Sequence, residues 1–315
     1  MIPKPPHTRN LQDDLKKFIG EAQRIIASFV NTLAGAPPII YHYTDDAGLR
    51  GILETGHVWL TNIFNLNDPS ELRHGICHAL NILKGMVANG PPESKEFAEG
   101  LAAFFRQVGI EESGHYFICS FSSCRDDLGQ WRAYGDDGRG YALGFDATVL
   151  ENGFTGGSPP NTEAFRITYK DNELDNRLRQ IIESYRRALD LDLRLQSGVS
   201  MGDRADLYTW LTVYLVRTAL FFKHEAYDNE QEYRFLQLYG ADELPPNMKV
   251  RTRPYSLIRY KEFDWRSVAA GALNEIVVGP AAHHEKASRF ARDCLHLFHG
   301  KTVPITYSSI PYRAI

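Results

Sequence analysis

Apolar positions recur with two different periods along the chain, which indicates both helices and strands. From Leu11 onward they return at steps of three and four residues, which predicts an amphipathic helix that ends near Gly35. Residues 39–44, "IIYHYT", form a short run of aliphatic and aromatic residues, which predicts a strand. A helix is expected over 45–54, with Gly56 as its stop. A helix therefore precedes a body in which strands and helices alternate.

The same reasoning extends to the C-terminus. Further strands are predicted at 57–63, 115–122, 141–146, 164–169, 227–239, 274–280 and 302–308. Further helices are predicted at 72–86, 94–107, 126–134, 174–195, 205–222 and 285–297. Asp68 followed by Pro69, with Glu71 as the third residue after Asp68, is typical of a capped helix start. Helices interspersed between strands in this way predict the α+β class.

The expected domain organisation follows from this order of elements. Residues 1–36 are predicted to form an N-terminal helical layer. Residues 37–315 are predicted to form a single α+β domain, interrupted by a helical insertion near 172–223. The sequence contains no internal repeat and no low-complexity tract, which argues against a repeat architecture.

Composition and charge narrow the classes of function. With 315 residues, of which 43% are hydrophobic, the chain can bury a large core. The net charge of -4 gives no overall basic field for nonspecific nucleic-acid binding. The most apolar helical segment, 207–222, contains Arg217 and is too short and too polar to cross a bilayer. Because "MIPKPPHTRN" also lacks the apolar core of a signal peptide, a cytoplasmic protein without a membrane partner is expected.

Cysteines and histidines give no clear metal-ligand pattern. The four cysteines include no Cys-x-x-Cys pair and are expected to be reduced. The His283–His284 pair and the pair His296 and His299 have no acidic or thiol partner at a spacing that completes a site. No metal site is therefore expected.

Three polar clusters lie at the ends of predicted strands, where sheet proteins often bind their ligands. They are "YHYT" at 41–44, "SFSS" at 120–123 and "EQE" at 230–232. In an extended strand, Glu230, Glu232 and Arg234 share one face. Two carboxylates on one face repel each other, unless they are solvated or have a chemical role.

Each cluster also has a structural interpretation. His42 is equally typical of a core histidine held by one hydrogen bond, and serines at a strand end are often turn formers. The glutamates fit a solvated strand entrance in which burial begins only at Leu236. Arg234 would neutralise Glu232 under either interpretation.

The order of the clusters resembles the ADP-ribosyltransferase superfamily: His-Tyr-Thr on an early strand, Ser-x-Ser on a middle one and Glu-x-Glu entering a late one. Longer segments resemble a bacterial family known as a domain of unknown function, number twenty-nine seventy-one. These segments include "GILETG", "QWRAYG..GRGYALGFD", "KHEAYDNEQEYR" and "ITYSSIPYR", and the resemblance runs from about 39 to 313. The first resemblance implies a split antiparallel sheet with inserted and N-terminal helices, and NAD as substrate.

The superfamily resemblance also implies roles for individual residues. Glu232 would be the catalytic carboxylate that faces an oxocarbenium-like state, and Glu230 would orient or deprotonate the acceptor. His42 would hold the adenosine-side ribose. The remaining expected contacts are Tyr43 and Thr44 as pocket lining, Ser120 and Ser122 as supports of the glutamate, and Arg132 or Arg139 at the pyrophosphate.

The aromatic residue that would stack on nicotinamide is left open between Tyr134, Tyr141 and Trp131. "QWRAYG" is equally typical of a small amphipathic helix in which Trp131 fills the core. The chain has no Gly-x-Gly-x-x-Gly motif, and "GDDGRG" at 135–140 is expected to be a turn, which argues against a Rossmann site.

The sequence thus leads to one favoured hypothesis and two alternatives. The favoured one is an NAD-dependent ADP-ribosyltransferase or NAD glycohydrolase, acting as a toxin or phage-defence effector on a protein or nucleic-acid acceptor, with an antitoxin or defence partner. The first alternative is a noncatalytic nucleotide- or ligand-binding module. The second is an enzyme that processes RNA or nucleotide phosphates on a related fold.

Overall fold

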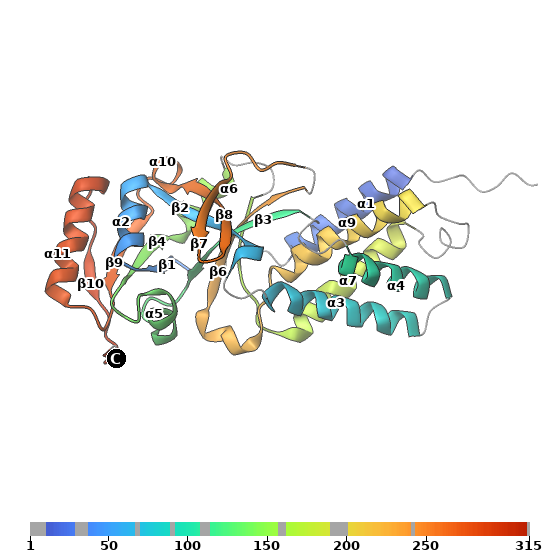
Figure 1. The fold of residues 1–315 in the computed structure, drawn as a ribbon, viewed down its shortest axis with the longest axis horizontal. Coiled ribbons are helices and arrows are strands. Elements are labelled where there is room, and N and C mark those ends of the chain that lie inside the picture. Colours follow the sequence, from blue (N-terminus) through green and yellow to red (C-terminus); the bar gives the residue numbers. More distant parts are fainter. Residues whose placement is uncertain are drawn as a thin grey trace, which may run out of the picture. The chain divides into compact units, whose positions relative to one another are not determined.

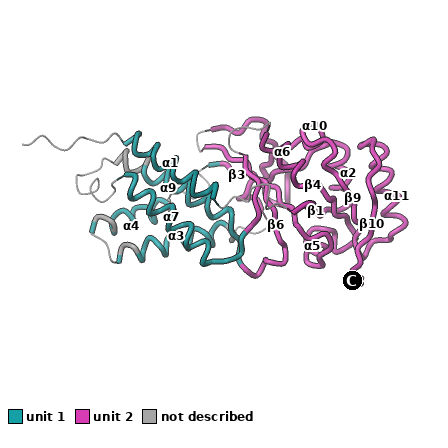
Figure 2. Tube along the Cα trace, turned by 180° about the vertical axis from the view of Figure 1, so that it is seen from behind, with its two compact units in different colours: residues 1–29, 68–114, 168–224 teal, residues 30–67, 115–167, 225–315 magenta. Residues whose placement is uncertain are grey.

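The computed structural model divides the chain into two compact units (Figure 2). The residues that it describes are 11–28, 37–66, 70–88, 92–107, 114–156, 162–189, 201–240 and 243–313. One unit combines residues 1–29, 68–114 and 168–224, and the other combines 30–67, 115–167 and 225–315. We describe each unit by itself.

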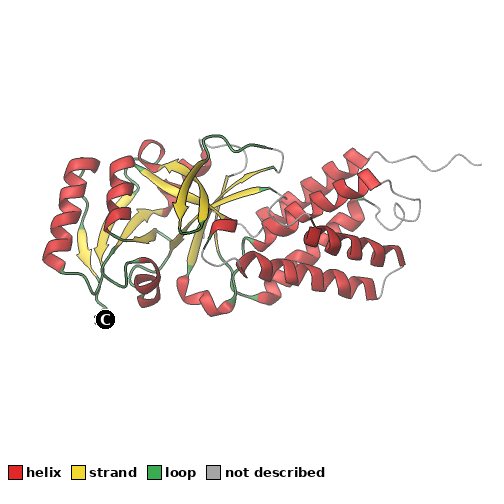
Figure 3. Cartoon of the chain, viewed as in Figure 1, coloured by secondary structure: helices red, strands yellow, loops and turns green. Residues whose placement is uncertain are grey.

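The first unit is built from helices (Figure 3). They are α1 (Leu11–Ala27), α3 (Ser70–Ala88), α4 (Pro92–Gln107), α7 (Asp171–Ala188) and α9 (Met201–Ala219). In its core, the ring of Phe18 lies 4.8 Å from that of Tyr185 and 5.1 Å from that of Tyr214, both edge-on. Helix α3 packs against α4, α7 and α9, so helices far apart in sequence share one core.

The helix positions agree with the sequence, but some boundaries differ, and α9 spans Met201–Ala219 rather than 205–222. Helices are present at all the positions predicted for this unit. Helix α1 ends at Ala27, before the expected end near Gly35, and the predicted cap at Asp68 and Pro69 lies outside the described residues. Helix α7 ends at Ala188, with Leu189 as its C-cap, so the predicted end at 195 is wrong.

The second unit is α+β, with a large and mostly antiparallel sheet (Figure 1). Its strands are β1 (Ile39–Thr44), β2 (His57–Asn62), β3 (His115–Ser122), β4 (Tyr141–Asp146), β5 (Thr162–Arg166), β6 (Glu232–Tyr239), β7 (Lys249–Arg253), β8 (Ser256–Asp264), β9 (Leu273–Val278) and β10 (Ile305–Tyr307). The order along the sheet is β10-β9-β4-β1-β3-β2-β8-β7, and β6 pairs with β3 and β5. Strands β9 and β10 pair in parallel.

Strand β3 is a branch point of the sheet. One of its edges pairs with β6 over its whole length, from His115 opposite Tyr239 to Ser122 opposite Glu232. Its other edge meets β1 only where Tyr41 lies opposite Ser122, and meets β2 at 117–118. Strands β1 and β2 therefore leave the same edge of β3 at different points, and the sheet opens between them.

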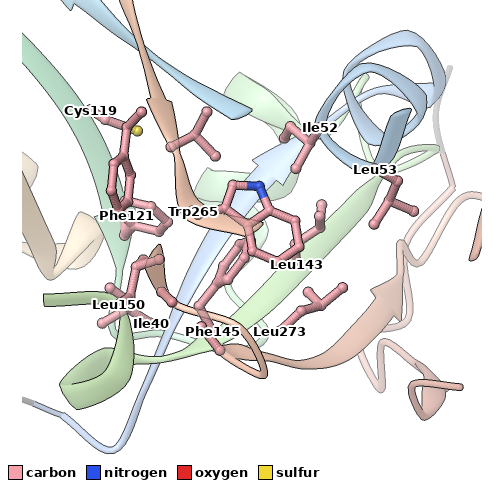
Figure 4. Packing of buried hydrophobic residues seen from close by; sticks show 14 of the residues in the cluster. Ile40, Ile52, Leu53, Cys119, Phe121, Leu143, Phe145, Leu150, Trp265 and Leu273 are labelled. Carbon is pink, nitrogen blue, oxygen red and sulfur yellow. The ribbon is translucent and has the colours of Figure 1, made fainter. Parts of the chain in front are cut away.

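The main core lies on one face of this sheet (Figure 4). Ile40, Leu143 and Phe145 contribute from β1 and β4, and Trp265 packs edge-on against Phe145 at 5.2 Å. Helices α2 (Asp46–Thr55), α6 (Ala147–Gly156), α10 (Trp265–Val268) and α11 (His284–Cys294) add buried residues to this face. Helix α11 continues into the turn η5 (Leu295–His299). Burial of this aromatic and aliphatic surface stabilises the unit.

The opposite face carries a smaller cluster. Tyr41, Tyr43 and Ala142 alternate with the main-core residues of β1 and β4, and they pack with Trp131 and Val277. Trp131 comes from the short helix α5 (Leu128–Tyr134), which Asp127 caps by accepting a hydrogen bond from the amide of Gln130. Because side chains alternate along a strand, these two clusters show on which face each polar residue of β1, β3 and β6 lies.

Several local predictions are confirmed. Helix α2 begins after Asp45, whose carboxylate accepts a hydrogen bond from the Gly48 amide, and it ends at Gly56 with φ of 73°. Gly56 suits this left-handed position because it has no Cβ. Residues 135–140 form the expected turn between α5 and β4. No described helix combines the length and apolar character that crossing a bilayer requires.

Other elements were not predicted. They are β7, β8, α6, α10, the short turn η2 (Ile63–Asn65) and the 3-10 turn η4 (Glu225–Glu230), which stands where a strand was predicted from 227. The sequence of β7, "KVRTR", is mostly exposed and lacks the alternation of apolar and polar residues that marks a half-buried strand. Its pairing with β8, rather than burial, makes it a strand.

Candidate active site at the branch of the sheet

Glu232 is the first residue of β6 and lies opposite Ser122 of β3. Its Oε1 accepts a hydrogen bond of 2.5 Å from Ser120 Oγ and one of 2.7 Å from Arg234 Nε. Glu232 is only 4% exposed and Arg234 only 1%. A buried carboxylate is tolerated when it is paired and hydrogen-bonded, as it is here. The interpretation of the glutamates as a solvated strand entrance is therefore wrong for Glu232.

Glu230 does not share the strand face of Glu232, which corrects the expectation from alternation. It ends a short 3-10 turn, η4 (Glu225–Glu230), and Gln231 then takes a positive φ of 44°. This left-handed residue breaks the extended geometry between the two glutamates. The Glu230 carbonyl accepts a hydrogen bond of 2.6 Å from Ser122 Oγ. Ser120 thus contacts the carboxylate of Glu232, whereas Ser122 fixes the backbone that precedes it.

His42 lies where β1 leaves β3. Its Nδ1 is 3.1 Å from the Ser120 carbonyl oxygen, and because a carbonyl only accepts, we assign the ring proton to Nδ1 and the lone pair to Nε2. The register places His42 on the main-core face, and its ring lies 5.4 Å from that of Phe121. Burial lowers the pKa of His42, against a smaller opposing effect of the Ser120 carbonyl, so the ring is neutral at pH 7.

Ser120 therefore connects the other two clusters. Its side chain contacts Glu232 and its carbonyl contacts His42. The carboxylate of Glu232 lies on the face of Tyr41 and Tyr43, whereas the imidazole lies on the main-core face. The sequence predicted that these residues lie near one another, but it did not show that they approach from opposite faces of the sheet.

Tyr43 and Trp131 pack together in the smaller cluster. The Tyr43 hydroxyl donates to the Cys124 carbonyl at 2.8 Å, and its ring lies edge-on to Trp131 at 4.8 Å. Trp131 is 0% exposed, and its Nε1 donates to Asp126 at 2.7 Å. The interpretation of Trp131 as the core residue of a small helix is confirmed, and it has no exposed face on which nicotinamide could stack.

The two tyrosines considered for stacking differ in accessibility. Tyr141 is buried on the main-core face, where its hydroxyl donates to the Ala287 carbonyl. Tyr134, at the end of α5, is 45% exposed. Tyr134 is thus the only one of the three aromatic candidates with a substantial accessible surface.

The remaining predicted contacts lie around β1 and α5. Arg132 and Arg139 are exposed, and Arg139 forms an ion pair of 3.2 Å with Asp136 within the turn. Helix α5 packs against β1 and against η4, which carries Glu230. Thr44, at the end of β1, packs against Gly48 in the first turn of α2. Arg132 and Tyr134 are thus carried by an element that contacts two parts of the candidate site.

Sequence reasoning missed a second polar network on the face of Tyr41. Glu275 of β9 accepts hydrogen bonds from the Tyr41 hydroxyl at 2.9 Å and from Thr306 at 2.9 Å, and Arg125 binds it in a bidentate manner. Burial raises the pKa of Glu275, but these three partners outweigh it and hold the pKa below its usual value. The four residues come from distant segments, so no spacing in the sequence could have revealed the network.

The arrangement around Glu232 fixes the position of a buried carboxylate whose charge Arg234 balances. The carboxylate is held by a serine hydroxyl and a guanidinium, so it needs no reorganisation when charge develops beside it. The neutral imidazole of His42 offers one nitrogen as a hydrogen-bond acceptor, which suits a hydroxyl such as that of a ribose. Among the described residues, the histidine and carboxylate groups close enough to hold a metal ion lie in the helical unit instead.

Comparison with known proteins gives one match. No curated protein and no solved structure matches the chain significantly. The matched segment, residues 130–235, includes Tyr134, Arg139, Glu230 and Glu232 of the candidate site. It matches the model of a family described as "Protein of unknown function (DUF2971)", so this segment of the chain is similar to that family.

Proposed function

We propose that the protein cleaves the nicotinamide glycosidic bond of NAD, as an ADP-ribosyltransferase or NAD glycohydrolase. The single observation that carries this proposal is the linkage of three clusters through Ser120, which contacts both Glu232 and His42. The superfamily resemblance requires these clusters to meet at one site, and here Glu232 and His42 meet Ser120 from opposite faces of the sheet. The mostly antiparallel sheet that opens at β3 is in keeping with the expected ADP-ribosyltransferase-like fold.

Each residue has a role in this proposal. Glu232 stabilises the oxocarbenium-like state as the bond to nicotinamide breaks. Ser120 is a positioning residue that holds Glu232, and His42 accepts a hydrogen bond from a ribose hydroxyl. Glu230, at the end of η4, orients or deprotonates the acceptor.

Further residues around Glu232 contact other parts of NAD in this proposal. Tyr134 provides the exposed aromatic face for nicotinamide, and Arg132 or Arg139 meets the pyrophosphate. Tyr43 and Thr44 support the wall of the site along β1. The acceptor is a protein, a nucleic acid or water, and the biological role is that of a toxin or phage-defence effector with an antitoxin or defence partner.

The test is nicotinamide release from NAD, followed by mass spectrometry. Purified protein is incubated with NAD, with and without a bacterial lysate as the source of acceptor, and Glu232→Gln serves as the comparison. We expect release by the wild type and its loss in a Glu232→Gln variant that circular dichroism shows to be folded at the assay temperature. Absence of release from the wild type in both conditions would overturn the proposal.

One observation favours a noncatalytic nucleotide- or ligand-binding module instead. Arg234 and Glu232 are both buried and form an ion pair of 2.7 Å, an arrangement that also occurs where a polar network only fixes the packing of strands. This candidate predicts that Glu232→Gln changes stability while no NAD is consumed. Isothermal titration of the wild type with NAD and with other nucleotides distinguishes a binding module from a purely structural network.

A further inference from the structure

We infer that His74, His78 and Asp171 of the helical unit form a binding site for a divalent first-row transition metal ion, with Zn²⁺ as its best probe. Each residue offers one donor atom, and the three atoms all lie within 4.8 Å of one another. A metal ion about 2.0–2.2 Å from each donor would separate donors in a tetrahedral site by about 3.4 Å. The observed spacing therefore requires only small side-chain adjustments.

Two packed helices place these residues. His74 and His78 are four residues apart on α3, and Asp171 and Asp175 are four residues apart on α7. Residues with this spacing lie on the same face of a helix. Because α3 packs against α7, the imidazoles meet the carboxylates across the contact. Each pair is visible in the sequence, but their meeting depends on the packing of the helices.

Both histidines approach the carboxylate of Asp171. His74 Nε2 lies 2.9 Å from Asp171 Oδ1, which is hydrogen-bonding distance. His78 Nε2 lies 3.9 Å from Asp171 Oδ2, which is too long for a hydrogen bond. The two imidazoles thus converge on a single carboxylate, and a metal ion would satisfy all three donors at once.

A second and independent observation comes from Asp175. His78 Nδ1 lies 2.7 Å from Asp175 Oδ1 and donates its proton there, so in the neutral ring Nε2 carries the lone pair on the side of Asp171. Metal-binding histidines are commonly oriented by such a carboxylate behind the ring. The rings of His74 and His78 are also in contact, with their centroids 4.6 Å apart.

The donor set indicates which ions fit. Two imidazole nitrogens and one carboxylate oxygen suit Zn²⁺, Co²⁺, Ni²⁺ or Fe²⁺, whereas Mg²⁺ and Ca²⁺ prefer oxygen ligands alone. Three protein ligands leave a coordination position for water. Because the Asp171 side chain is 51% exposed, solvent can reach the cluster. The ring of His224, 5.5 Å from that of His74, lies beside it.

The experiment measures metal binding directly and needs no NAD, so its outcome is separate from that of the proposed function. Full-length protein is stripped with a chelator and titrated with Zn²⁺ by calorimetry and with Co²⁺ by visible absorption. We expect one Zn²⁺ per chain and a Co²⁺ spectrum with d–d bands of imidazole and carboxylate coordination. His74→Asn and Asp171→Asn should each weaken binding by more than about 100-fold.

Two further variants sharpen the test. Asp175→Asn removes only the orienting carboxylate and should weaken Zn²⁺ binding by about 10–100-fold. His57→Gln is the matched control, because His57 also faces an aspartate, Asp264 at 4.0 Å, but belongs to the sheet unit. It should bind as the wild type does. A wild type that binds no Zn²⁺, or binds it no more tightly than His74→Asn and Asp171→Asn, would overturn the inference.

Discussion

At the scale of the residue, the stability of β6 depends on the ion pair between Glu232 and Arg234, whose charges neutralise each other. Both side chains are almost fully buried, and their charged atoms lie 2.7 Å apart. Water cannot compensate either charge if the other is removed, so the pair acts as one unit. This coupling gives a direct prediction about stability.

Arg234→Met leaves Glu232 buried without its ion-pair partner. We expect the free energy of unfolding to fall by about 3–5 kcal/mol, measured by urea denaturation. The double variant Glu232→Gln/Arg234→Met removes both charges and should be less destabilised than Arg234→Met alone. If the double variant is as unstable as the sum of the two single variants, the residues do not act as a pair.

The free energy of unfolding should depend on pH through His42. Burial lowers its pKa below the ordinary value of 6.5, so the unfolded chain takes up a proton that the folded protein does not. The free energy of unfolding should therefore fall as pH drops below about 6.5. At higher pH, His42 should add nothing to the pH dependence of that free energy. His42→Gln should show a shallower pH dependence in denaturation experiments from about pH 8 to about pH 5. An NMR titration in which the His42 ring has an ordinary pKa would contradict this account.

At the scale of the element, the junction between η4 and β6 decides where Glu232 stands. Gln231 holds a positive φ of 44° there, and its side-chain amide donates to the Asp228 carbonyl at 2.6 Å. The following residue enters β6 opposite Ser122. A non-glycine residue in this conformation carries a backbone cost, which substitution can reveal.

Gln231→Gly and Gln231→Ala both lose the side-chain hydrogen bond, but only alanine keeps a Cβ. We expect the glycine variant to be more stable than the alanine variant by about 1 kcal/mol, because glycine adopts positive φ without penalty. Thermal denaturation of the two variants side by side measures this difference. Equal stabilities would mean that Gln231 is not constrained to a left-handed conformation.

The sequence predicted most strands of the sheet, because a buried strand appears in the sequence as a short run of apolar and aromatic residues. "IIYHYT" and "HYFICSFS" gave β1 and β3 with their observed bounds. It could not place Glu230, because glutamine rarely takes a positive φ and Gln231 carries no turn signal. Nor could it show that β1 and β3 pair at a single position, which is what brings His42 to the carbonyl of Ser120.

At the scale of the whole molecule, contacts between distant segments organise the chain. The sequence grouped residues 1–36 as one layer and placed an insertion near 172–223, whereas the structure combines 1–29, 68–114 and 168–224 in one helical unit. Amphipathic periodicity identifies a helix but not its neighbours. For the same reason the meeting of His74 and His78 with Asp171 was not foreseen, although each helix shows its spacing.

The measurement that tests the central claim most directly compares two buried glutamates: Glu232, the first residue of β6, and Glu151 of α6. Glu151 is also buried and accepts a hydrogen bond of 2.5 Å from Tyr233, the residue next to Glu232, so Glu151→Gln controls for the loss of a buried carboxylate. The rate of nicotinamide release from NAD is measured for the wild type, Glu232→Gln and Glu151→Gln. We predict a fall of about 10²–10⁴-fold for Glu232→Gln and a near wild-type rate for Glu151→Gln. Equal rates in the two folded variants, or no release by the wild type, would contradict the assignment of Glu232 as the catalytic carboxylate.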